Sequence, residues 1–152
     1  MSILGRPARE ETQPDDHLIR AIEHLSAVLA SAGEGSDLTW VGRVQLAARS
    51  VEQALVNHRD VTEGEGGALA RLLEQKAALQ QEVTNQVAEH AELIHRAASF
   101  VTACEKERAF QEANVEINRL DGQILGLMVR RHLAWESALS FEAFFRDEGG
   151  EG

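Results

Sequence analysis

The chain has little of the material that cross-linked, membrane-spanning or aromatic β-rich proteins need. Its 152 residues include one cysteine, two prolines and no tyrosine. Cys104 therefore cannot form a disulfide within the chain, and the shortage of proline and aromatic residues disfavours turn-rich β architectures. No run reaches the roughly 18 apolar residues that a membrane span needs. These absences favour a helical protein in a reduced, soluble compartment, and we expect a cytoplasmic location.

Basic residues are also few. Lysine and arginine number 15 against 25 aspartates and glutamates, which gives a net charge of −10. Such a charge repels phosphate backbones and anionic lipids, so we expect no nucleic-acid or membrane partner, whereas cations are a better match. Residues 1–14 lack the basic start and apolar run of a signal peptide, and we predict a disordered lead-in there. Residues 148–152 form an acidic, glycine-rich tail.

What the sequence does contain is apolar residues at helical spacing, in four segments. The predicted core positions of the first two segments are Leu18, Ile22, Leu25 and Leu29, then Val41, Val44, Ala48, Val51 and Leu55. Those of the last two are Leu69, Leu72, Leu79, Val83, Val87, Ile94, Ala97 and Val101, then Phe110, Ile117, Leu120, Ile124, Met128, Trp135 and Leu139. Residues spaced by three and four lie on one face of a helix, so each segment predicts an amphipathic helix.

The breaks between these segments indicate how the helices are arranged. Breaks are expected at 33–37, 63–67 and 104–109, the first two of them rich in glycine. Short links favour antiparallel neighbours, so we predict an all-α, antiparallel up-down-up-down four-helix bundle over residues 15–147. The last two helices are long enough for an extended coiled-coil dimer, but the wide apolar stripe is more typical of a bundle. A homodimer is left open.

Four of the six histidines fall one in each predicted helix, at His17, His58, His90 and His132. Antiparallel packing brings these positions to one level, provided that the start of the third helix overhangs the bundle or is partly non-helical. Imidazoles that meet in a bundle core near carboxylates are typical of a non-haem iron or other transition-metal site. For the two remaining histidines, His24 and His95, no partner falls at a matching level, and we expect them on the surface.

The sequences around the four histidines resemble those of the hemerythrin family, also called the HHE cation-binding domain. The similar segments are DHLIR at 16–20, NHR at 57–59, EHAEL at 89–93 and RHLAWE at 131–136. The resemblance implies iron held between the helices, with dioxygen or nitric oxide as ligand or with redox state or iron as the signal sensed. It assigns His17, His58, His90 and His132 as metal ligands, together with Glu136 on the fourth helix.

The second helix departs from the family pattern, in which a glutamate four residues after the histidine bridges two metals. Thr62 stands at that position and Glu63 follows one residue later, so Glu63 is a candidate ligand and the centre is mono- or dinuclear. No nucleophile with a nearby base and no phosphate-binding loop is evident, so we do not expect an enzyme. The sequence predicts a hemerythrin-like metal-binding protein that binds or senses dioxygen, nitric oxide or iron. The alternative is a degenerate, metal-free bundle that serves as a structural or protein-interaction module.

Overall fold

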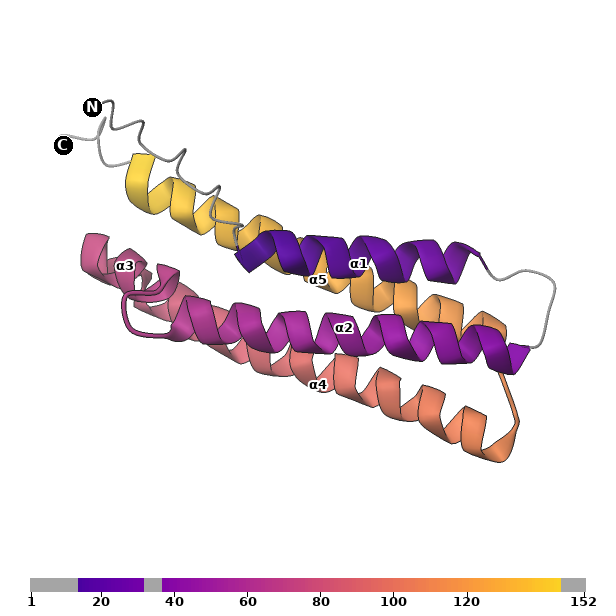
Figure 1. The fold of residues 1–152 in the computed structure, drawn as a ribbon. Helices are drawn as coiled ribbons and strands as arrows, with labels where there is room; N and C mark the ends of the chain where they lie inside the picture. Colours follow the sequence, from indigo (N-terminus) through magenta and orange to yellow (C-terminus); the bar gives the residue numbers. More distant parts are fainter. Residues whose placement is uncertain (1–13, 32–36, 146–152) are drawn as a thin grey trace, which may run out of the picture.

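The computed structural model describes residues 14–31 and 37–145, and all the regular structure in these residues is helical (Figure 1). The elements are α1 (Pro14–Ala30), α2 (Asp37–Glu63), α3 (Ala68–Gln75), a 3₁₀ turn η1 (Ala77–Leu79), α4 (Gln80–Phe110) and α5 (Val115–Phe145). The predicted all-α class is confirmed for this part of the chain. The predicted lead-in, apart from Pro14, and the acidic tail lie outside the described residues. None of the described helices combines the length and apolarity needed to cross a lipid bilayer.

The long helices α1, α2, α4 and α5 lie alongside one another in one elongated body (Figure 1), an arrangement compatible with the predicted antiparallel bundle. The predicted core positions of α1 and α2 are confirmed. Leu18, Ile22, Leu25 and Leu29, and likewise Val41, Val44, Ala48, Val51 and Leu55, are at most 1% exposed. They pack into one cluster with residues of α4 and α5, among them Leu93 and Val129.

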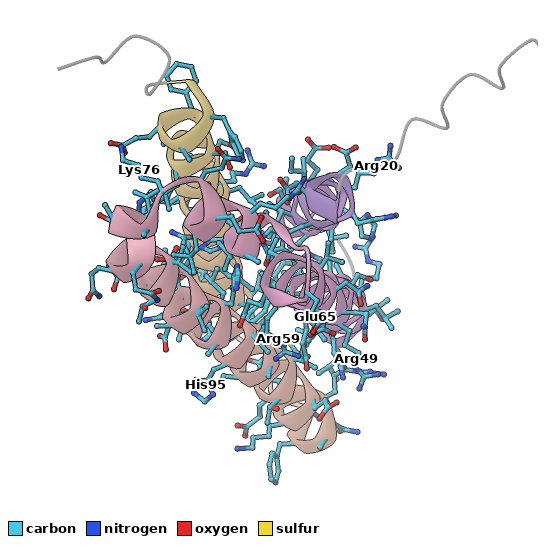
Figure 2. All side chains as sticks on the ribbon, turned by 90° about the vertical axis from the view of Figure 1, so that its left-hand side faces the viewer. Arg20, Arg49, Arg59, Glu65, Lys76 and His95 are labelled. Atoms are coloured by element: carbon cyan, nitrogen blue, oxygen red, sulfur yellow. The ribbon has the colours of Figure 1, made fainter. Side chains whose placement is uncertain are left out.

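The connection between α2 and α4 is folded rather than extended. Gly66 adopts a left-handed conformation with φ of 67°, and a Cβ on Gly67 would lie 2.4 Å from the carbonyl oxygen of Val61. These two positions therefore need glycine, and they end α2 where the sequence predicted a break. The segment expected to begin the third helix instead forms the separate helix α3 and the turn η1. Figure 2 shows α3 lying across this end of the bundle.

The turn before the last helix lies later in the chain than predicted. We expected a break at 104–109, but α4 continues to Phe110 and the fully buried Cys104 packs in the core. The charged residues there lie on the outer face of a continuous helix, where Glu105 pairs with Arg49 on α2. Gln111 ends α4 in a left-handed conformation. The Asn114 side chain then accepts a hydrogen bond from the N–H of Ile117 at 3.1 Å, which caps the start of α5.

The predicted core face of the last helix is wrong over its first half. Ile117, Leu120 and Ile124 are 54%, 57% and 41% exposed, and Phe110 lies at the exposed end of α4. The buried line of α5 runs instead through Asn118, Gly122, Leu125, Gly126, Val129, His132, Leu139 and Ala143. Small and polar residues thus occupy the inner face because α1 approaches it closely, with the Leu29 side chain against Gly122. Val87 on α4 is likewise exposed, and the buried residue beside it is Gln86.

Candidate metal centre

A layer of polar side chains separates two apolar clusters of the core. The larger cluster contains Leu55, Leu93 and Val129, and a smaller one beneath α3 contains Leu69, Leu72, Leu79, Val83, Leu139 and Ala143. His58 follows Leu55 on α2, His90 lies between Val83 and Leu93 on α4, and His132 lies between Val129 and Leu139 on α5. All three histidines are at most 1% exposed. Three long helices therefore each deliver one imidazole to the same buried layer.

The three imidazole rings face a single carboxylate. The centroids of the His90 and His132 rings are 4.7 Å apart, and the His58 ring lies 5.1 Å and 5.6 Å from them. Glu136, one turn after His132, places Oε1 2.8 Å from Nε2 of His90 and 2.7 Å from Nε2 of His132. Its other oxygen, Oε2, lies 2.9 Å from Nε2 of His58. The ligand atoms of these four residues all lie within 4.8 Å of one another.

The opposite nitrogen of each ring faces a second carboxylate. The contacts at Nδ1 are Asp15 with His58 at 3.0 Å, Glu63 with His90 at 2.7 Å and Glu89 with His132 at 2.9 Å. In each case the partner comes from a different helix than the histidine. Carboxylates at this position fix the orientation of metal-binding histidines and direct the other ring nitrogen toward the ion.

The pKa values of the centre reflect this concentration of charge. Burial by itself lowers the pKa of His58, but the Asp15 and Glu136 carboxylates outweigh it and raise that pKa to about 9. Burial likewise favours the neutral form of Glu136, yet the contacts with His132, His58 and His90 hold its pKa far below the usual range. Glu136 is therefore an ionised carboxylate enclosed by imidazoles.

The donor set fits a metal ion. A neutral imidazole has one N–H, yet each of the three rings has carboxylate oxygens beside both nitrogens, so one contact per ring joins a lone pair to an anion. Moreover, both nitrogens of His58 and Nε2 of His132 are buried without a hydrogen bond of acceptable geometry. A cation between the Nε2 atoms and Glu136 would take up one lone pair of each ring and give Nε2 of His58 and Nε2 of His132 a partner, at bond lengths of about 2.0–2.2 Å. A ligand set of imidazoles and a carboxylate suits iron, zinc and other first-row transition metals.

Four of the six residues predicted as ligands come together, namely His58, His90, His132 and Glu136. His17 does not join them. It is exposed, because it lies about 100° around α1 from the buried Leu18. Its place beside His58 is taken by Asp15, which lies on the same face of α1 as Leu18. The expected convergence of four histidines is therefore corrected to three.

Glu63, the remaining predicted ligand, contacts Nδ1 of His90 rather than the centre of the cluster. Thr62, at the position of the family's bridging glutamate, is buried and donates a hydrogen bond to the His58 carbonyl at 2.8 Å. His24 and His95 are exposed, as predicted, and Figure 2 shows His95 pointing away from the bundle. Asp15 and Glu89 were missed as partners, although each is an acid within two residues of a predicted histidine.

Comparison of the chain with family models, curated proteins and solved structures found no significant match.

Proposed function

We propose that this protein binds one transition-metal ion through His58, His90, His132 and Glu136, with iron as the preferred ion. The observation that carries the proposal is the double set of carboxylates: Glu136 faces all three Nε2 atoms, and a separate carboxylate faces every Nδ1 atom. A histidine that only fills a core needs one hydrogen-bond partner, not two anions. Three histidines held in this way resemble a prepared metal site.

The proposed role is the binding or sensing of a small molecule at that ion, in a hemerythrin-like protein. The choice of iron and the hemerythrin-like assignment rest on the sequence segments around His58, His90 and His132. One ion is proposed rather than two because His17 is exposed and Thr62 presents no carboxylate. When bound, the ion would supply a Lewis acid and, for iron, a redox-active centre. The residues of the chain hold its ligands in place and exclude water from three of them.

The competing function is the metal-free bundle, in which the same groups form a structural network. The raised pKa of His58 favours this alternative, because a protonated His58 forms ion pairs with both Asp15 and Glu136 without any metal ion. The two functions differ in metal content.

The decisive measurement is the metal content of protein made with added iron and purified without chelator. We expect close to one iron per chain, and uptake of one ferrous ion by the stripped protein under anaerobic conditions. His58→Ala and Glu136→Gln should each lower the affinity for iron by more than about tenfold, since both remove a donor that the remaining ligands cannot replace at fixed geometry. Elemental analysis and anaerobic titration provide the readouts.

His95→Ala is the matched control, since His95 is an exposed histidine five residues beyond His90 on α4 and its replacement should leave iron binding unchanged. Glu136→Gln preserves side-chain shape, so it separates loss of a ligand from loss of packing. Background iron in the folded parent protein, with no anaerobic uptake of ferrous ion, would establish the metal-free function instead.

A further inference from the structure

A large cavity adjoins the histidine cluster at the end of the bundle covered by α3. Its volume is about 730 Å³, and its wall comes from the end of α2, the glycine-rich connection, α3 and the last turns of α5. Asp15 and Glu136 both line it, whereas His58, His90 and His132 do not. Glu136 is 14% exposed and the three histidine side chains are at most 1% exposed. Glu136, which contacts all three histidines, is therefore accessible to solvent through this cavity.

The lining of this cavity is mostly apolar, with polar groups at a few places. The apolar side chains are Val61, Leu69, Leu72, Leu139, Phe141 and Phe144. The polar residues on the wall are Thr62, Ser137 and Ser140, the backbone of Gly64–Gly67, and the charged side chains Asp15, Asp60, Glu65, Arg71 and Glu136. Apolar walls with a few polar groups are typical of sites for small organic ligands.

The size of the cavity decides between a diatomic gas and a larger ligand. A water molecule, similar in size to dioxygen, takes up about 30 Å³. Sites for organic ligands have volumes of about 300–1,000 Å³. The observed cavity falls within that range and is far larger than a gas requires. Phe141 and Phe144 are exposed on its wall. Their aromatic side chains offer more contact area than a diatomic gas can use, and this area suits an apolar ligand body.

We propose that the centre binds a small organic molecule that has an apolar body and a metal-coordinating head, such as a hydroxamic acid or a thiol. The head reaches the ion beside Glu136, and the body lies against Leu69, Leu72 and Leu139. This inference rests on the proposed function, since the ion anchors the head. It extends that function by replacing a gas with an organic ligand.

The test uses straight-chain hydroxamates, from acetohydroxamate to octanohydroxamate, titrated calorimetrically into iron(II)-loaded protein without oxygen. Each additional methylene should tighten binding by about fourfold until the cavity is filled, which is the effect of burying one methylene. Metal-free protein should bind the whole series at least tenfold more weakly. An affinity that does not change with chain length in iron-loaded protein would overturn this inference and leave the metal site standing. Failure to load iron would overturn both.

Two serine variants localise the effect to this cavity. Ser140→Trp fills the cavity, whereas Ser99→Trp places the same bulk in a different surface groove, between α4 and α5. Ser140→Trp should leave iron content and acetohydroxamate affinity unchanged but weaken octanohydroxamate binding by more than tenfold. Ser99→Trp should change none of these, and circular dichroism checks that both variants fold. Equal octanohydroxamate affinities in the two variants would contradict the assignment of the apolar body to this cavity.

Discussion

His58 has unusual surroundings for a core residue. Its side chain is fully buried, with Asp15 at one ring nitrogen and Glu136 at the other. Burial alone would lower its pKa, but these carboxylates raise it to about 9 from the usual 6.5. A proton on His58 therefore stabilises the metal-free folded state, while a metal ion must displace that proton. Binding of metal and binding of protons compete at this residue.

The stability of the metal-free protein should consequently fall as the solution becomes alkaline. Because the pKa is higher in the folded than in the unfolded chain, the contribution of His58 is complete below pH 6.5 and is lost as pH rises through about 9. The size of the effect is on the order of 3 kcal/mol in the free energy of unfolding. Urea denaturation of chelator-treated protein between pH 6 and 9.5 measures it. Asp15→Asn should flatten the decline, and a parent protein of constant stability across this range would rule out the charged pairing.

The sequence predicted part of the centre at this scale. His58 and His90 could be recognised because each lies within an apolar stripe, and Glu136 because it matches the carboxylate of the family that the segment around His132 resembles. The carboxylate partners could not be assigned, since Glu89 lies beside His90 in the chain yet contacts His132 on another helix. His17 does not join the cluster because antiparallel packing predicted its level along the bundle but not the face of α1 on which it lies.

At the scale of helices, α5 has two faces of different kinds. Its outer face carries Ile117, Leu120 and Ile124, while its inner face carries the small residues Gly122 and Gly126. The prediction from apolar residues alone therefore took the outer face of α5 for the buried one. A close approach between α1 and α5 is a property of two helices together, so the spacing of residues in one helix cannot reveal it. By contrast, α1 and α2 were predicted correctly because each has a single apolar stripe.

The two glycines of α5 should respond oppositely to replacement by alanine. A Cβ at Gly122 would lie 2.6 Å from Cδ1 of the buried Leu29, whereas a Cβ at Gly126 would lie 3.8 Å from Cγ2 of Ile22, an ordinary contact. We expect Gly122→Ala to lower the free energy of unfolding by about 1–3 kcal/mol through overpacking. Gly126→Ala should raise it by about 0.5–1 kcal/mol, because alanine favours helix.

Chemical denaturation of the two variants beside the parent protein measures both effects. Each variant serves as the control for the other, since the same methyl group is added four residues apart on the same helix. Equal effects of the two substitutions would mean that α1 and α5 do not approach as closely as the structure indicates.

At the scale of the whole molecule, the histidine cluster joins all four long helices. Asp15 comes from α1, His58 and Glu63 from α2, Glu89 and His90 from α4, and His132 and Glu136 from α5. An ion held there would bind the folded chain and not the separated helices. Metal binding should therefore stabilise the entire bundle rather than one part of it.

Thermal unfolding with and without iron tests this linkage. At a free metal concentration one hundred times the dissociation constant, an ion that binds only the folded state stabilises it by about 2.7 kcal/mol. For a domain of this size, that corresponds to a rise in Tm of about 5–11 °C. Anaerobic calorimetry should show the rise in the parent protein and in His95→Ala but not in Glu136→Gln. An unchanged Tm at saturating, demonstrably bound iron would contradict a site shared by four helices.

The position of α3 has a consequence for how such a protein can diversify. The connection between α2 and α4 forms part of the cavity wall, including Gly64–Gly67, Leu69 and Leu72. None of His58, His90, His132 and Glu136 belongs to that connection. Loops and short connecting elements accept substitutions and insertions more readily than packed helices do. Selection could therefore reshape the cavity through the connection while the helices that carry the histidine cluster stay the same, so that the surroundings of the cluster can change without a change in the cluster itself.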